Sequence, residues 1–223
     1  MSSYVRLHCL AEGETEQIFA ERILTSYLAR KNIRLSCSLI GKRGGDIRFA
    51  RAKNDLKAFL LGNTGCYLTF MIDFYGTPKN DWPGLSEACR ESTPQNKAKT
   101  VNQATATAVA ALIPNDANRR FIPYISMHEF EALLFSEPKI LANELGVDVS
   151  LIDSILNRSS PEEINNSANT APSKRLASLI PRYKKTITGI AIAEKIGIDK
   201  MRQACPLFDQ WLQEIENLPR ADH

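Results

Sequence analysis

An apolar segment that ends at a carboxylate and a glycine constrains the fold of this chain most. Val5–Ala11 has the composition of a β-strand, and Glu12 and Gly13 follow it directly. Gln17–Arg30 then places apolar side chains at helical spacing, so we expect the chain to turn at Gly13 and enter a helix. Glu12 would therefore lie at the carboxyl end of the strand and Glu16 in the first helical turn, beside the crevice where α/β folds bind ligands.

Strand-like and helix-like segments continue to alternate as far as about residue 136. Cys66–Ile72 is an almost continuous apolar run, as expected of a central strand that is buried on both faces. Arg34–Ile40 and Phe121–Met127 are predicted to be further strands, and Asp46–Leu61 and Gln95–Leu112 are predicted to be helices. This order predicts an α/β fold with a parallel-rich sheet and flanking helices.

The remaining residues have a different pattern. Ser136–Asn157 favours short helices, Arg158–Pro172 is rich in loop-forming residues, and Lys174–Glu216 is divided by proline and glycine into several short helices. We therefore expect two parts, an α/β domain over residues 1–136 and a helical C-terminal extension over residues 137–223, packed together as one compact unit.

Composition places the chain among ordinary globular proteins. It has 223 residues, of which 43% are hydrophobic and 24% charged, and it contains no apolar run near the ~20 residues that span a bilayer. Its start does not resemble a secretion signal, and its five cysteines form no C-x-x-C pair. We expect a cytoplasmic protein without a membrane segment, whose cysteines are buried thiols rather than zinc ligands.

Charge is distributed unevenly, although the net charge is only +3. Residues 129–163 contain 8 acidic and 2 basic side chains, whereas residues 174–202 contain 8 basic and 2 acidic side chains. An acidic segment followed by a basic one suits metal ions beside a phosphate backbone, although a solvated helix face explains either segment alone.

Acidic residues follow three of the predicted strands. The carboxyl ends of parallel strands share one edge of a sheet, so we expect these side chains to meet in one crevice. Like charges packed together raise each other's pKa and repel, a cost that a bound divalent cation removes. Such a site supports phosphoryl transfer, with Glu12 and Asp73 as catalytic residues. The expected ligands of Mg²⁺ or Mn²⁺ are Glu12, Glu16, Asp73, Glu129 and Glu131.

Each acid also fits a structural role. Glu12 suits a surface position at a strand end, Glu16 suits the positive end of a helix, and Asp73 suits the cap of a turn. Glu129 and Glu131 lie two positions apart on a predicted helix. They should therefore not share a face of that helix, and at most one of them should bind the metal directly.

Basic residues complete the expected site. Lys174 follows Pro172-Ser173 and is placed to act as a catalytic residue that stabilises charge on a transferring phosphoryl group, although a solvated helix face explains it equally. His128 fits a metal ligand, an acid–base group or a core histidine. The residues expected to contact the substrate are Lys42, Arg43, His128, Arg175 and Lys185.

Four motifs together resemble a family of bacterial proteins that has an E-G-x-T-E start and an H-E-F-E-A-L-L core. These motifs are Glu12-Gly13-Glu14-Thr15-Glu16, Asp73-Phe74-Tyr75, His128–Phe135 and Pro172-Ser173-Lys174-Arg175. That family is similar to the Toprim domains of the overcoming-lysogenisation-defect (OLD) nucleases. The resemblance implies a Toprim-like sheet, Mg²⁺-dependent cleavage of nucleic acid, and a genetic setting beside ATPases in anti-phage systems.

The resemblance also implies roles for individual acids. Glu12 matches the glutamate that follows the first Toprim strand, and Glu16 matches the second acid of the OLD-type pattern. Asp73 matches the first acid of the D-x-D motif, but Tyr75 stands where that motif has its second acid. A phenol does not replace a carboxylate as a ligand of a hard metal at neutral pH, so one ligand would be lost.

Later residues match the family more loosely. Glu129 and Glu131 fall where OLD-type nucleases have a later acidic motif. Lys174 is the best match to the distal lysine, and Lys184 and Lys185 compete for that role.

The acidic residues and the resemblance together predict a divalent-metal-dependent nuclease that cleaves DNA or RNA phosphodiesters. The resemblance further implies a bacterial anti-phage system and an ATPase partner, and a homodimer is a further expectation. Tyr75 favours a first alternative, a non-catalytic subunit of an ATPase-containing complex that binds nucleic acid or a partner protein. A second alternative is a nucleotide phosphohydrolase that uses the same acids.

Overall fold

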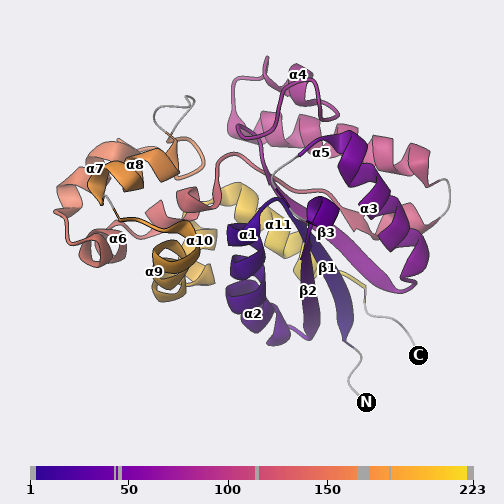
Figure 1. Ribbon diagram of the computed structural model, residues 1–223, viewed down its shortest axis with the longest axis horizontal. Coiled ribbons are helices and arrows are strands. Elements are labelled where there is room, and N and C mark those ends of the chain that lie inside the picture. The colour runs from indigo at the N-terminus through magenta and orange to yellow at the C-terminus, as the bar shows by residue number, and fades with distance from the viewer. Residues whose placement is uncertain are drawn as a thin grey trace.

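The structure of the chain is a computed structural model that describes residues 4–42, 44, 47–113, 116–164, 171–180 and 182–219. Asp46, expected to begin a helix, lies outside the described residues. The described part is an α/β fold in which helices flank a five-stranded sheet (Figure 1).

All described strand pairings are parallel, as the sequence predicts. The strand order is β2-β1-β3-β4, and β5 also pairs with β3. The predicted first, second and central strands are confirmed to within one residue at each end. The strands are β1 (Val5–Ala11), β2 (Ile33–Leu39), β3 (Cys66–Asp73), β4 (Phe121–Ile122) and β5 (Ile125–Ser126).

The strand expected over residues 121–127 is divided into β4 and β5. Pro123 lies at the interruption and has no amide hydrogen to donate to a neighbouring strand. β4 pairs with the middle of β3, and β5 pairs with its end, where Ser126 lies opposite Asp73. The interrupted strand therefore still reaches the carboxyl edge of the sheet.

Helices cover both faces of the sheet. The helix expected over residues 17–30 is one continuous helical run, made of α1 (Glu14–Phe19), a π-helical turn (Ala20–Leu24) and α2 (Thr25–Ala29). The other helices of this part of the chain are α3 (Phe49–Gly62), the short α4 (Leu85–Ala88) and α5 (Pro94–Leu112).

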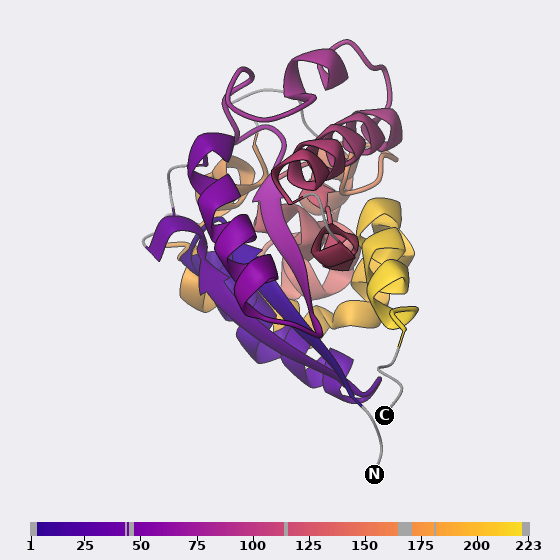
Figure 2. The ribbon, with the colours of Figure 1, turned by 90° about the vertical axis from the view of Figure 1, so that its right-hand side faces the viewer.

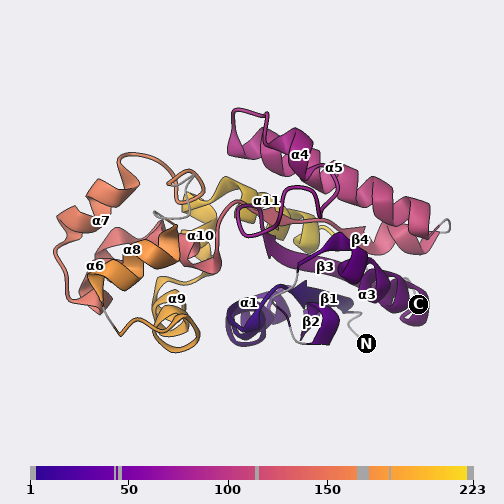
Figure 3. The same cartoon turned by 45° about the horizontal axis from the view of Figure 1, so that its top comes forward.

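The C-terminal part consists of short helices, as expected. None of the described helices is both long enough and apolar enough to cross a membrane. A π-helical turn, Lys185–Gly189, leads into α9 and contacts α1, so that α9 lies beside α1 (Figures 1 and 3). The helices are α6 (Pro138–Leu145), α7 (Val149–Leu156), α8 (Pro172–Leu179), α9 (Ile190–Ile196), α10 (Ile198–Ala204) and α11 (Pro206–Glu216).

Each face of the sheet contributes to its own hydrophobic core. Side chains alternate along a strand, so Leu7 and Cys9 of β1 pack into one core and Leu10 packs into the other. The first core also contains α1, α2 and the C-terminal helices, and the second contains α3 and α5 (Figure 2). Burial on both faces explains why β3 is mostly apolar before Asp73.

The last helix packs directly on the sheet. Trp211 of α11 stacks on Tyr124 with ring centroids 4.4 Å apart, and its indole Nε1 donates a hydrogen bond of 2.9 Å to Thr69 Oγ1 of β3. The C-terminal helices therefore share a core with the sheet.

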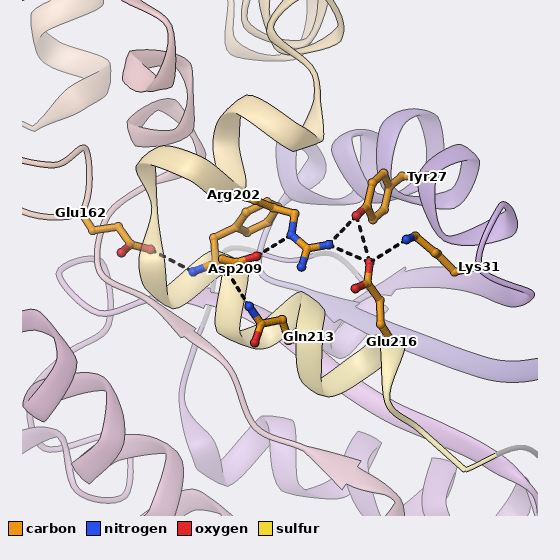
Figure 4. Close-up of polar contacts among 8 residues, drawn as sticks. Tyr27, Lys31, Glu162, Arg202, Asp209, Gln213 and Glu216 are labelled. Carbon is orange, nitrogen blue, oxygen red and sulfur yellow. Dashed lines mark hydrogen bonds and ion pairs between the residues drawn. The ribbon is translucent and has the colours of Figure 1, made fainter.

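Arg202 connects three helices at the edge of this core (Figure 4). Its guanidinium group donates hydrogen bonds to Asp209 and Glu216 of α11 and to Tyr27 Oη of α2. Its side chain is only 17% exposed, and Tyr27 also donates a hydrogen bond of 2.9 Å to Glu216. One largely buried cation thus offsets the charge of two partly buried carboxylates.

We predict that Arg202→Met lowers the free energy of unfolding by about 3 kcal/mol, because it leaves two part-buried carboxylates without their cation. Lys31→Met is the matched control, since Lys31 lies 4.0 Å from Glu216 and its side chain is 49% exposed. That control should change stability by less than about 0.5 kcal/mol. Urea denaturation of both variants measures the difference, and equal losses would contradict the prediction.

Candidate functional site

Two neighbouring parallel strands bring Glu12 and Asp73 together. Glu12 follows the last residue of β1, and Asp73 is the last residue of β3. The backbone amide of Glu12 donates a hydrogen bond to Met71 of β3. In return, the backbone amide of Asp73 donates a hydrogen bond of 2.9 Å to Glu12 Oε2. The expected meeting of these acids at one edge of the sheet is therefore seen in the structure.

Glu16 lies in the first turn of α1, as expected. Gly13 is the N-cap residue of α1, and a Cβ on Gly13 would lie 3.0 Å from Glu16 Oε2. Burial raises the pKa of Glu16, while hydrogen bonds from the backbone of Glu16 and Gly13 oppose the shift. The Glu16 carboxylate thus accepts backbone hydrogen bonds at the start of its own helix. Its charge also raises the pKa of Glu12 and Asp73.

Glu129 and Glu131 both contact Lys185, which corrects the expectation that they cannot share a face. Each has a carboxylate oxygen 3.2 Å from Lys185 Nζ. The expectation assumed an α-helix from residue 128 onward. Instead, Glu129 is extended, with φ −52° and ψ 157°, and a 3₁₀-helix (Phe130–Ser136) follows it. The two carboxylates can therefore converge on one ammonium group.

The start of α8 also reaches this cluster, through its backbone. The amide of Ser173 donates a hydrogen bond of 3.1 Å to Glu129 Oε2. Lys174, the expected catalytic lysine, is exposed on the same helix, and Arg175 is half-buried. Lys185, expected among the substrate contacts, is the described lysine that pairs with the acids.

Burial and mutual repulsion dominate the electrostatics of the first two acids. Burial raises the pKa of Glu12 to about 9, and the charges of Asp73, Glu16 and Glu129 add to the shift. Burial likewise raises the pKa of Asp73 to about 7, although the Gly76 amide opposes it. Both carboxyl groups therefore favour protonation when no cation lies between them.

The pKa values of the other two acids differ because Glu131 is more deeply buried and Glu129 accepts hydrogen bonds from Ser173. Burial opposes ionisation of Glu129, but hydrogen bonds from Ser173 and the charge of Lys185 lower its pKa below the usual value. Burial raises the pKa of Glu131 to about 7 in spite of Lys185. Glu131 is fully buried, and its Oε1 atom has no described hydrogen-bond partner.

The five carboxylates form what we call the acidic cluster: Glu12, Glu16, Asp73, Glu129 and Glu131. One described lysine, Lys185, forms ion pairs with its members. Within the described residues, no three carboxylate, histidine or cysteine side chains are already arranged to hold a metal ion. The donors are all oxygen atoms, and their charge exceeds that of one lysine, so the set fits a hard divalent cation that draws the side chains together.

A family model matches residues 11–216 of the chain. The chain belongs to the DUF4276 family, a domain of unknown function. All five acids and Lys185 lie inside the DUF4276 match. Searches of curated proteins and of solved structures found no match.

The glycine-rich segment of this DUF4276 domain approaches the acidic cluster through Gly44. Gly44 has φ +65°, and a Cβ there would lie 2.7 Å from the backbone oxygen of Glu12, so only glycine fits. Arg43 and the side chain of Lys42, both expected to contact substrate, lie outside the described part of the chain.

His128 is buried beneath Tyr75. Its ring is stacked on that of Tyr75, with centroids 5.0 Å apart, and the residue is only 3% exposed. Burial lowers the pKa of His128 to about 4, so it is neutral near pH 7. Of the three roles that the sequence left open, a core histidine agrees best with this burial. Sequence reasoning missed Lys97, which donates a hydrogen bond to Tyr75 Oη, because nothing distinguishes it within a polar helix.

Two larger pockets of the structure lie away from the acidic cluster. One, of about 600 Å³, is on the sheet face near His8 and Phe59, and the other, of about 530 Å³, lies between α5 and α11. Neither is lined by a member of the cluster. A pocket of about 440 Å³ beside Tyr75 adjoins the cluster instead.

We predict that the metal-free protein loses stability as the pH rises. An unperturbed glutamate has a pKa of 4.5, whereas the folded protein raises the pKa of Glu12 to about 9. The folded state then binds more protons than the unfolded state between these values, so the free energy of unfolding falls as the pH rises through them. Thermal unfolding in EDTA at a series of pH values measures this slope.

Glu12→Gln should flatten that slope, because a neutral amide cannot titrate. Glu14→Gln is the matched control, since Glu14 lies two residues away and is exposed in the first turn of α1, and it should change the slope less than Glu12→Gln does. An identical slope in wild type and Glu12→Gln would contradict the prediction.

Proposed function

We propose that this protein is a divalent-metal-dependent nuclease whose acidic cluster hydrolyses phosphodiesters of nucleic acid with Mg²⁺ or Mn²⁺. The observation that carries the proposal is the gathering of five carboxylates from three parts of the chain at the carboxyl edge of a parallel sheet. Repulsion among clustered carboxylates destabilises their charged forms, and a divalent cation bound by their oxygen atoms offsets that repulsion. Edges of this kind are where α/β folds bind ligands.

The acids and Lys185 would have different roles in the reaction. Glu12, Glu16, Asp73 and Glu129 would hold the cation. When bound, it would supply Lewis-acid catalysis to the phosphoryl group. Lys185 would stabilise negative charge on the phosphoryl oxygens, and buried Glu131 would hold the lysine in place. Loss of the proton from Glu12 would accompany loading of the site, because the raised pKa keeps that carboxyl protonated until then.

The wider setting of the proposal comes from the resemblance to Toprim domains of OLD-type nucleases. It adds a Toprim-like fold, an ATPase partner, a role in anti-phage defence and a homodimer as parts of the proposal. A cytoplasmic location agrees with the five cysteines, all of which are free thiols.

Tyr75 favours a second candidate function, a non-catalytic subunit that binds nucleic acid or a partner ATPase. The resemblance places a second metal-binding acid at this position, and the chain has a phenol there. Stable co-purification with an ATPase, together with no cleavage under any divalent cation, would favour this candidate over the nuclease.

We predict that purified protein cleaves plasmid or oligonucleotide substrates with Mg²⁺ or Mn²⁺, and that EDTA abolishes cleavage. Glu12→Gln and Asp73→Asn should each lower the rate by more than about 100-fold, because even the outer partners of metal ligands change activity about 10- to 100-fold. Gel-based cleavage assays measure the rates.

Glu14→Gln serves as the matched control and should cleave like wild type, since its side chain is exposed outside the cluster. Calorimetric titration with Mn²⁺ gives a second measurement, in which binding releases protons and weakens in Asp73→Asn. Equal cleavage by wild type and both cluster variants would remove the acidic cluster from catalysis.

A further inference from the structure

The pocket of about 440 Å³ lies between the segment that follows β3 and helices α4 and α5. It adjoins the acidic cluster, because Gly76 lines it and donates its amide hydrogen to Asp73 Oδ1. A Cβ on Gly76 would lie 2.5 Å from the same oxygen, so the backbone approaches Asp73 as closely as glycine allows. A ligand in the pocket would therefore lie next to the acids.

One wall of the pocket is an exposed aromatic ring held from two sides. Tyr75 is 41% exposed, although large aromatic side chains are usually buried. His128 stacks on its ring at an interplanar angle of 20°, and Phe74 meets it edge-on at 79° with centroids 5.1 Å apart. Both supporting side chains are almost fully buried. The Tyr75 ring is thus a firmly held planar surface at the pocket.

The charged side chains that line the pocket are Lys97 and Lys79, and its described lining contains no carboxylate. Lys97 Nζ lies 3.2 Å from Tyr75 Oη and 5.8 Å from the Phe74 ring centroid, and no described carboxylate pairs with it. Other lysines of the chain, such as Lys195, do form such pairs. The charge of Lys97 therefore remains available to an anionic ligand.

A planar aromatic wall, apolar side chains such as Leu85, and two ammonium groups together match the chemistry of a nucleotide. Aromatic side chains stack with bases, and lysines bind phosphate. The volume falls within the range of pockets that hold small ligands. A base inside a duplex is covered on both faces by its neighbours, so only an unstacked base can enter.

We propose that this pocket binds one nucleotide of a single-stranded nucleic acid and places the adjoining phosphodiester at the acidic cluster. The assignment rests on the proposed function for the place of cleavage, but the binding itself does not depend on cleavage. Tyr75, which stands where the resemblance has a metal ligand, acts here as a substrate-binding residue.

Fluorescence anisotropy in EDTA, where no cleavage occurs, tests the proposal on the full chain. The probes are a labelled oligothymidylate of about 15 nucleotides, a duplex of the same length, and free thymidine monophosphate as a competitor. Single strand should bind at least about 10-fold more tightly than duplex or mononucleotide. Tyr75→Ala should weaken single-strand binding about 10-fold, whereas Tyr75→Phe, which keeps the ring, should bind nearly as wild type does.

Lys97→Gln should weaken binding and lower the salt dependence by about one phosphate contact, a slope change of about 0.7. Lys99→Gln is the matched control, since Lys99 is exposed on the same helix outside this pocket, and it should change neither quantity. Unchanged melting temperatures would show that the variants are folded.

The proposal would be overturned by no binding of single strand, by equal binding of single strand and duplex, or by equal effects of Lys97→Gln and Lys99→Gln. Mononucleotide that binds as tightly as the oligonucleotide would overturn the assignment to a strand. Failure of the proposed function would give a different result. A protein that binds single strand through Tyr75 but cleaves nothing with Mg²⁺ or Mn²⁺ would support the binding pocket and contradict only the hydrolytic role.

Discussion

Repulsion among buried carboxylates is the constraint on which the rest of this structure depends. The parallel sheet brings Glu12 and Asp73 together, so that the Asp73 backbone amide donates a hydrogen bond to the Glu12 carboxylate. Glu16 and Glu129 add further negative charge. Desolvation makes every one of these charges more costly. The C-terminal part of the chain offsets part of this cost, since it places Lys185 and the Ser173 amide against the acids. The helical extension thus contributes a positive charge and a hydrogen-bond donor to the site, as well as apolar side chains to the core.

The fold and the meeting of the first acids could be predicted because short-range signals determine them. An apolar strand followed by an acid, a glycine and an amphipathic helix leaves little choice of structure, and parallel pairing then fixes the edge at which the acids lie. The interruption at Pro123 was visible in the sequence as well, but the predicted strand ran across it. The proline removes one backbone donor and divides the strand, but pairing with β3 resumes in β5, so its effect is local.

The part of the site that the sequence did not predict depends on tertiary structure. Glu129 and Glu131 share a lysine because Glu129 is extended before a 3₁₀-helix, a choice that hydrophobic periodicity does not reveal. The pairing lysine is Lys185 rather than Lys174, because a helix fixes which side faces the core, and Lys174 faces solvent. Lys97 and the support of Tyr75 by His128 join segments distant in sequence, so no local pattern could have revealed them.

The ion pairs of Lys185 have a consequence for how the molecule is made. Residues that complete the cluster lie far apart in the chain, from Glu12 to Lys185, and the entropic cost of closing that loop must be overcome before these residues meet. During synthesis, Glu129 and Glu131 leave the ribosome well before Lys185 does. A nascent chain therefore lacks the partner that offsets their burial until Lys185 has emerged, and the site can assemble only after that point.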